Sequence, residues 1–183
     1  MRGTIHYCLE ETIIEKYGQK QWEKCLTTMG LPADHSFVSQ LRDDIDEELT
    51  MKFIGNVPSV LECSLQQVFD DFGDYWCITY APKMYGMFYI GVTTTKQMVM
   101  KLSNIHVIVA KVKVDATPPF FEYNEIADNI VEVTYLSKRG LFDLYISLVG
   151  GLDKYFNNQT KIEKLNVILA ELSLSFSDRK SVV

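Results

Sequence analysis

The sequence contains no uninterrupted apolar stretch near the roughly 20 residues that a membrane-spanning helix needs. It has no run of lysines or arginines either, and its 24 acidic residues outnumber its 18 basic ones. Its first residues, Met-Arg-Gly-Thr-Ile-His, lack the long apolar core of a secretory signal. These absences predict a cytoplasmic protein whose partners are neither membranes nor nucleic acid.

Cysteine is sparse and scattered. The residues Cys8, Cys25, Cys63 and Cys77 form no CxxC pair and no cluster with histidine, which argues against a zinc site and predicts reduced thiols. Repeats, low-complexity tracts and linkers are also missing. A chain of 183 residues, 47% of them hydrophobic, is therefore expected to form one domain spanning residues 1–183.

The first half of the chain has the apolar period of helices, with hydrophobic residues every three or four positions. Two short helices are expected to end at Gly18 and Gly30. Pro58 is expected to kink or end a third helix.

Two further helices have recognisable starts. Ser64 and Gln67 have the spacing of a capping box, and the helix that follows them is expected to run to Pro82. Residues 93–95 are threonines that can cap a long helix, and this helix carries His106.

The period changes to two in the second half of the chain. Residues 130–135 and 172–176 are expected to be strands, and residues 141–156 an apolar helix interrupted by Gly150 and Gly151. Helices followed by an antiparallel sheet with a packed helix predict an α+β domain.

The strand expected at residues 130–135 is followed by polar residues at the positions that would continue its core-facing side. Alternate residues share a face, so Tyr135, Ser137 and Arg139 continue the row of Val131 and Val133. Buried hydroxyl and guanidinium groups are costly unless paired, so the row calls for an anionic partner, for which the carboxylates of haem are suited. An edge strand with a solvated polar end is the alternative, and the pattern alone leaves it open.

His106 lies close to the apolar stripe of its helix, about 40° from Leu102. A lone histidine in such a place often only satisfies a neighbouring carbonyl group. The residues at 105 and 107–109 are Ile or Val, however, and we expect them to enclose the imidazole. A dry pocket with one imidazole suits axial ligation of haem.

Several short strings occur together at a characteristic spacing. Tyr135-Leu136-Ser137-Lys138-Arg139 begins 29 positions after His106, and Ala116-Thr117-Pro118-Pro119 lies between them. The opening Met1-Arg2-Gly3-Thr4-Ile5 and the segment Phe72-Gly73-Asp74-Tyr75-Trp76 complete the set. Through them nearly the whole chain resembles the H-NOX (haem nitric oxide/oxygen binding) family, whose motif is YxSxR.

The resemblance implies the H-NOX fold. A helical N-terminal distal part and a C-terminal part with an antiparallel sheet and packed helices would enclose a ferrous haem b. His106 would be the axial ligand of the iron. The haem propionates would be bound by Tyr135, Ser137 and Arg139.

The resemblance also implies how the signal arises. Pro119 would match the proline that distorts the porphyrin, and Ile5 would press on it from the N-terminal helix. When nitric oxide binds, the bond from His106 to iron would weaken, the haem would relax, and the two parts of the domain would shift.

The distal pocket that the resemblance implies is mainly apolar. Leu144 stands where oxygen-binding relatives have a tyrosine, Leu9 replaces the tryptophan that assists it, and Leu148 would line the same pocket. Bound oxygen benefits from a hydrogen-bond donor and nitric oxide does not need one, so binding of nitric oxide and carbon monoxide is expected. Trp76 and Tyr80 are potential donors, although core packing is their expected role.

The resemblance implies a sensor rather than an enzyme. The sequence has no cyclase or kinase motif, so the signal would pass to another protein, by family analogy a histidine kinase or a cyclic-di-GMP enzyme. Residues 157–183 contain no cysteine, so the zinc site of some bacterial relatives is not expected. Two alternatives stay open: an oxygen-binding haem protein with Tyr80 or Trp76 as donor, and a haem-free interaction domain in which His106 is structural.

Overall fold

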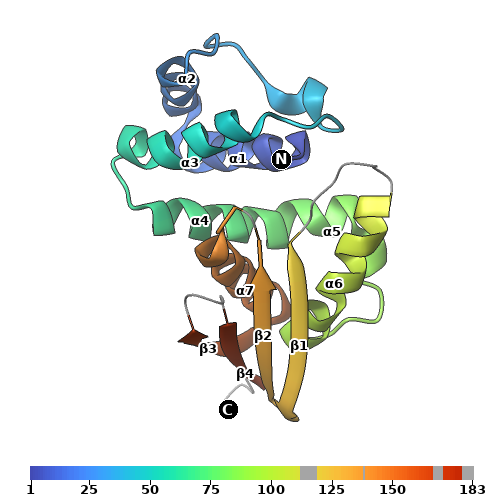
Figure 1. The fold of residues 1–183 in the computed structure, drawn as a ribbon. Helices are drawn as coiled ribbons and strands as arrows, with labels where there is room; N and C mark the ends of the chain where they lie inside the picture. Colours follow the sequence, from blue (N-terminus) through green and yellow to red (C-terminus); the bar gives the residue numbers. More distant parts are fainter. Residues whose placement is uncertain (112–118, 138, 167–170, 179–183) are drawn as a thin grey trace.

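The fold is that of a computed structural model, which describes residues 1–111, 119–137, 139–166 and 171–178. Figure 1 shows a helical layer at the top, a long central helix beneath it, and a sheet with packed helices below. The α+β class expected from the sequence is confirmed.

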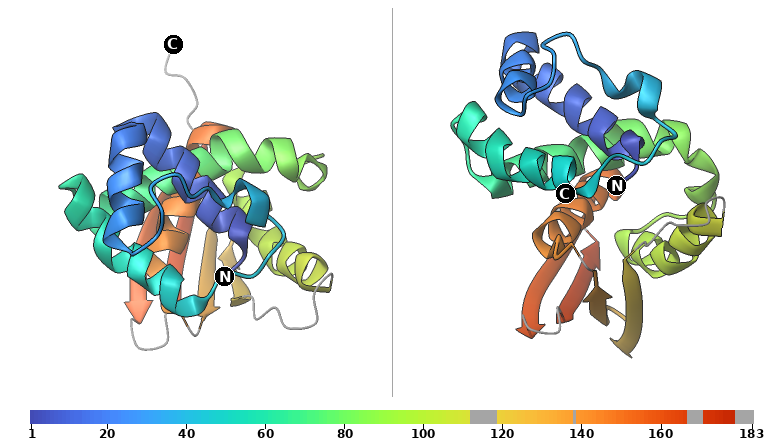
Figure 2. Two further views of the ribbon diagram at one scale, coloured as in Figure 1. Left: turned by 90° about the horizontal axis from the view of Figure 1, so that it is seen from above. Right: turned by 45° about the horizontal axis from the view of Figure 1, so that its top comes forward.

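The upper layer is formed by the N-terminal helices α1 (Gly3–Tyr17), α2 (Gln19–Thr28) and α3 (Glu47–Leu61), with the short 3-10 helix η1 (Phe37–Gln40). Figure 2 shows from two further sides that these helices cover one side of the central helix. As predicted, α1 ends before Gly18, which has a φ of 88°.

Pro58 does not break α3. The helix continues to Leu61 and ends at Glu62, which has a left-handed φ of 54°. Pro58 itself stays inside α3, within its last turn. An end of this helix at Pro58 is therefore ruled out, because the helix continues for three residues beyond it.

The central helix has three parts: α4 (Leu65–Asp74), the π-helical turn η2 (Tyr75–Tyr80) and α5 (Ala81–Met84), followed by the 3-10 helix η3 (Gly86–Phe88). The Ser64 hydroxyl caps α4 by accepting a hydrogen bond from the Gln67 amide at 3.1 Å.

The expected end of this helix at Pro82 was wrong. Pro82 lies in the first turn of α5, where a missing N–H is tolerated. The π-helical turn before it was also not predicted, because its residues keep an apolar pattern that does not reveal a change in helical pitch.

The C-terminal half combines a four-stranded antiparallel sheet in the order β1-β2-β4-β3 with two helices. Its elements are α6 (Thr95–Lys111), β1 (Phe120–Ala127), β2 (Ile130–Leu136), α7 (Phe142–Phe156), β3 (Asn158–Asn166) and β4 (Glu171–Asp178). The two predicted strands, β2 and β4, are the central ones, and the two edge strands were missed. Buried Val131, Val133, Val149 and Leu174 belong to the core between the sheet and the helices.

The helix α7 is continuous, so the predicted interruption at Gly150 and Gly151 was wrong. A Cβ atom on Gly151 would lie 2.3 Å from the carbonyl oxygen of Gly73, and one on Gly73 would lie 2.5 Å from that of Ser147. The glycines therefore let the backbones of α4 and α7 touch.

A buried carboxylate joins α1 to α4. Asp71 accepts hydrogen bonds from the Tyr17 hydroxyl at 2.6 Å, from the Gln67 side-chain amide at 2.9 Å and from the Lys16 ammonium. Burial by itself raises the pKa of this carboxyl, but the three donors outweigh it, so the pKa of Asp71 is lowered. We call this group the Asp71 bracket.

All four cysteines are free thiols, as expected. Every helix in the part of the chain that the structure describes is too short or too polar to cross a membrane.

Candidate functional site

His106 lies on α6 with its ring stacked against Phe121 of β1, at 5.4 Å between ring centroids and 13° between planes. Its Nδ1 atom is buried and has no hydrogen-bond partner within the described residues. Burial lowers the pKa of the imidazole, which is therefore neutral at pH 7. A neutral imidazole with an unpaired nitrogen is the form that ligates a metal.

The enclosure of His106 differs from the sequence expectation. Val107 and Ile108 are 50% and 52% exposed, because successive helical residues point about 100° apart. The side chain of Val109 lies outside the described residues. The imidazole stacks on Phe121, which the sequence did not single out.

Tyr135, Ser137 and Arg139 come together at the end of β2 and in the turn after it. Tyr135 is buried, and Ser137 Oγ accepts a hydrogen bond from the Arg139 backbone amide at 3.2 Å. Burial raises the pKa of the Tyr135 phenol, against opposing effects of Ser137 and the Arg139 charge. Since β2 pairs with strands on both sides, the edge-strand alternative was wrong.

The Arg139 guanidinium holds a carboxylate. Its Nη2 donates to Glu47 Oε2 at 3.0 Å, and its Nε donates to Glu47 Oε1. This pairing is the leading reason why the pKa of Glu47 is lowered. Glu47, at the start of α3, was not foreseen, because 92 positions separate it from Arg139. The group at the end of β2 is thus a built site for a carboxylate.

Pro119 is half-buried and directly precedes β1, two residues before Phe121. The residues Ala116, Thr117, Pro118 and Lys138 of the family strings lie outside the described residues.

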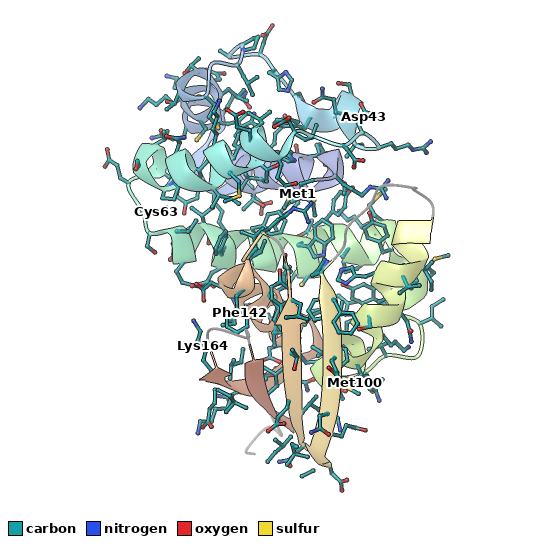
Figure 3. The ribbon with its side chains drawn as sticks, viewed as in Figure 1. Met1, Asp43, Cys63, Met100, Phe142 and Lys164 are labelled. Atoms are coloured by element: carbon teal, nitrogen blue, oxygen red, sulfur yellow. The ribbon has the colours of Figure 1, made fainter. Side chains whose placement is uncertain are left out.

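An apolar cavity separates the helical layer from the central helix, and Met1, labelled in Figure 3, is among its lining residues. The cavity is lined by Met1, Ile5, His6, Leu9, Thr50, Phe53, Ile54, Val57, Leu65, Val68, Phe69, Phe72, Leu141 and Leu144. Leu9 and Leu144, expected in the distal pocket, thus share one cavity with Ile5, which was expected to press on the porphyrin.

His6 is the feature of this cavity that sequence reasoning missed. It is 2% exposed, its Nε2 lies 3.1 Å from the Thr50 hydroxyl, and its Nδ1 lies 3.5 Å from the Arg2 carbonyl oxygen. Burial lowers the pKa of His6 to about 4. His6 and Thr50 are therefore neutral polar groups whose hydrogen-bonding atoms are directed at each other and at the backbone.

Trp76, Tyr80 and Leu148 pack beside the cavity, in one cluster with Ile5 and Leu144. Trp76 lies 5.4 Å from Tyr80 between ring centroids. The structure thus places the two potential donors in one packed cluster with Leu144 and Leu148. Tyr145, next to Leu144 in sequence, instead packs in the sheet-side core, on the other side of α7.

The Tyr80 hydroxyl has a partner in the N-terminal helix. It lies 2.7 Å from the hydroxyl of Thr4, and both side chains are buried. Nothing in the sequence pattern indicated this contact across 76 positions.

Comparison with solved structures shows the same fold. An oxygen-binding H-NOX domain related to soluble guanylate cyclases, in its oxygen complex, is 20% identical with a TM-score of 0.81, covering 100% of this chain and 97% of that one. An I5F mutant of the T. tengcongensis H-NOX is 20% identical with a TM-score of 0.84, covering 100% of both chains. A Cs H-NOX mutant with an unnatural amino acid at site 5 is 20% identical with a TM-score of 0.84, covering 100% and 98%.

No curated protein matches the sequence. The model of the family described as Haem-NO-binding (HNOB), by contrast, matches residues 2–164. The chain therefore belongs to the Haem-NO-binding, or H-NOX, family of haem-based gas-sensor domains and has the H-NOX fold.

Proposed function

We propose that this chain is a single domain, residues 1–183, that binds haem b and senses nitric oxide. The observation that carries the proposal is His106, a neutral imidazole on α6 with a buried nitrogen that no described residue satisfies. Buried polar atoms are rarely left unpaired, so an unpaired nitrogen indicates a missing partner. An iron coordinated by the imidazole would be that partner.

The surrounding residues fit haem rather than a metal ion held by protein alone. In the described part of the chain, no group of three or more His, Cys, Asp or Glu side chains could hold a metal ion. A porphyrin brings four ligands of its own and needs one from the protein. It also brings two propionates, for which Tyr135, Ser137 and Arg139 would be the binding groups. Pro119, two residues before Phe121, would support the macrocycle on the His106 side, and Ile5 on the cavity side.

Haem would supply the iron that binds the gas, and the protein would set which gas is retained. Leu9 and Leu144 offer the cavity no hydrogen-bond donor. Two polar side chains near the cavity are already paired, His6 with Thr50 and Tyr80 with Thr4. This arrangement favours nitric oxide and carbon monoxide over oxygen, since oxygen relies on a donor in the pocket.

The signal would pass from the pocket to a separate protein. The ion pair of Arg139 with Glu47 joins the turn after β2 to α3, so a change at the propionate site would bear directly on the helical layer. We propose a histidine kinase or a cyclic-di-GMP enzyme as the effector, by analogy with the family alone.

Optical spectra of the purified, haem-reconstituted protein test the proposal. The wild type is expected to show a Soret band that shifts on reduction and again on addition of nitric oxide. The haem of His106→Gly should lose its axial ligand from the protein, and added imidazole should restore the wild-type spectrum by taking the place of the side chain. The spectrum of the control His35→Gly should match that of the wild type. A protein that takes up no haem would instead be the haem-free interaction domain, and an unchanged His106→Gly spectrum would assign the ligand elsewhere.

A further inference from the structure

The contact of Thr4 with Tyr80 is more than core packing, because it engages the Tyr80 hydroxyl in a hydrogen bond next to the apolar cavity. Tyr80 is 8% exposed and Thr4 is 6% exposed, so water does not compete for either hydroxyl. Tyr80 lies in the same cluster as Leu144 and Ile5, two residues that line the cavity. Its phenol therefore combines a place beside the cavity with a fixed partner.

Acidity decides which of the two hydroxyls donates. A phenol is a much stronger acid than an aliphatic alcohol and a weaker acceptor, which favours Tyr80 as the donor to Thr4. Burial raises the pKa of Tyr80, which keeps its proton in place at pH 7. A phenol has one proton, and the bond to Thr4 uses it.

The ring of Tyr80 is held as firmly as its hydroxyl. It packs against Trp76 at 5.4 Å and Tyr7 at 6.1 Å between ring centroids, and against Tyr85 at 6.4 Å. Redirecting the hydroxyl proton into the pocket would therefore require rotation about the Cζ–O bond and the loss of the Thr4 bond. Without Thr4, the same hydroxyl would be buried and unpaired, which favours any acceptor within reach.

We infer that Thr4 sets the gas selectivity of this site by holding the Tyr80 hydroxyl away from the ligand. This inference rests on the proposed function. Oxygen bound in the pocket would carry negative charge and accept a hydrogen bond from a released Tyr80, whereas nitric oxide gains little from a donor. Thr4 is thus a positioning residue: by holding the Tyr80 hydroxyl it lowers the affinity for oxygen and leaves that for nitric oxide nearly unchanged.

The test compares Thr4→Val, Tyr80→Phe and the double variant, in the haem-reconstituted ferrous protein. Valine has the shape of threonine without the hydroxyl, so the packing around residue 4 is kept. Thr4→Val should bind oxygen roughly tenfold more tightly than the wild type, since a hydrogen bond to a charged acceptor is worth about that much or more. The gain should vanish in the double variant, and nitric oxide affinity should change less than twofold.

Thr12→Val is the matched control. Thr12 is a buried threonine of the same helix, but its hydroxyl donates to the Cys8 carbonyl oxygen at 2.6 Å. It should leave oxygen affinity unchanged. A second readout, free of haem, is urea unfolding of the apoprotein: the losses in Thr4→Val and Tyr80→Phe should not add, because both remove the same bond.

The outcomes separate this inference from the proposed function. A wild type that binds nitric oxide, beside a Thr4→Val variant without increased oxygen affinity, overturns the inference alone. The inference is also overturned if the gain in oxygen affinity persists in the double variant of Thr4→Val and Tyr80→Phe. Additive losses of apoprotein stability in the two single variants would overturn it as well. A wild type that takes up no haem overturns the proposed function and this inference together.

Discussion

The backbone of Gly151 in α7 lies directly against that of Gly73 in α4, so close that a single Cβ atom at position 151 would collide with the Gly73 carbonyl group. The two helices frame the sheet-side wall of the pocket. Their crossing therefore fixes where Leu144 and Leu148, earlier on α7, stand relative to the central helix.

Gly151→Ala should destabilise the fold by about 2 kcal/mol, because the new methyl group forces two packed backbones apart. Gly150→Ala is the control: a Cβ there meets nothing within 4 Å, so alanine should stabilise the helix by up to about 1 kcal/mol. Urea unfolding measures both changes. Equal stabilities of the two variants would contradict the close crossing.

Arg139→Ala should release haem roughly tenfold faster than the wild type, because charge-assisted hydrogen bonds to a propionate would be lost. The exposed Arg42, between η1 and α3, provides the control variant Arg42→Ala, which removes the same charge at another position. Haem transfer to an apo-globin acceptor gives the rates. The same rate in both variants would rule out Arg139 as a propionate ligand.

His6 should make the apoprotein sensitive to mild acid. Its pKa is about 4 in the fold and near 6.5 when unfolded, so below pH 6.5 the unfolded state binds a proton that the folded state does not. Stability attributable to His6 is thus fully present above pH 6.5 and is lost as the pH falls toward 4, at up to about 1.4 kcal/mol per pH unit.

Urea unfolding of the wild type and His6→Gln between pH 7 and pH 4.5 checks this. His106, whose pKa is also lowered by burial, contributes in the same direction and is present in both proteins. The variant should therefore retain a shallower pH dependence. If the free energy of unfolding changed equally with pH in the two proteins, the pKa of His6 would not be lowered in the folded state.

Leu144→Tyr should move the protein toward oxygen binding, since it places a donor in the cavity. A hydrogen bond to a charged acceptor changes affinity roughly ten- to a hundredfold. Leu9 offers no indole to orient the new hydroxyl, so the lower end of this range is expected. Leu144→Phe, which adds the ring without the hydroxyl, should show no gain in oxygen affinity. Comparable gains in both variants would attribute the effect to ring size.

Of the two strands that sequence analysis found, β2 buries one face, and β4 buries Leu174, the one of its side chains that the structure describes. In β2 alternate residues are buried, so the period of two is visible in Val131, Val133 and Tyr135. The edge strand β1 buries only Phe121 among its eight residues, and β3 is mostly exposed along its described side chains. Their pairing comes from backbone hydrogen bonds, which leave no hydrophobic pattern to read.

In the candidate site, too, local sequence patterns indicated some features, whereas contacts between residues distant in the chain were missed. Strand alternation predicted that Tyr135, Ser137 and Arg139 share one face, but β2 ends at Leu136, so only Tyr135 lies on the strand and the other two follow it in the chain. The contacts that complete the site join residues far apart in the chain: Arg139 with Glu47, and Thr4 with Tyr80. Such contacts depend on how layers stack, which the local periodicity of a single sequence does not encode.

The Asp71 bracket fixes the C-terminal end of α1, so α1 can pivot about that end. Ile5, which lines the cavity, lies 11 residues before Lys16, or about 17 Å along the helix axis. A displacement of about 1 Å at Ile5 then corresponds to a tilt of about 3° around the bracketed end. A movement that breaks the bond between Thr4 and Tyr80 and keeps the Asp71 bracket would therefore be a rotation of α1 with its pivot at Asp71, and its measure in structures of different ligand states is the angle of α1 rather than its translation.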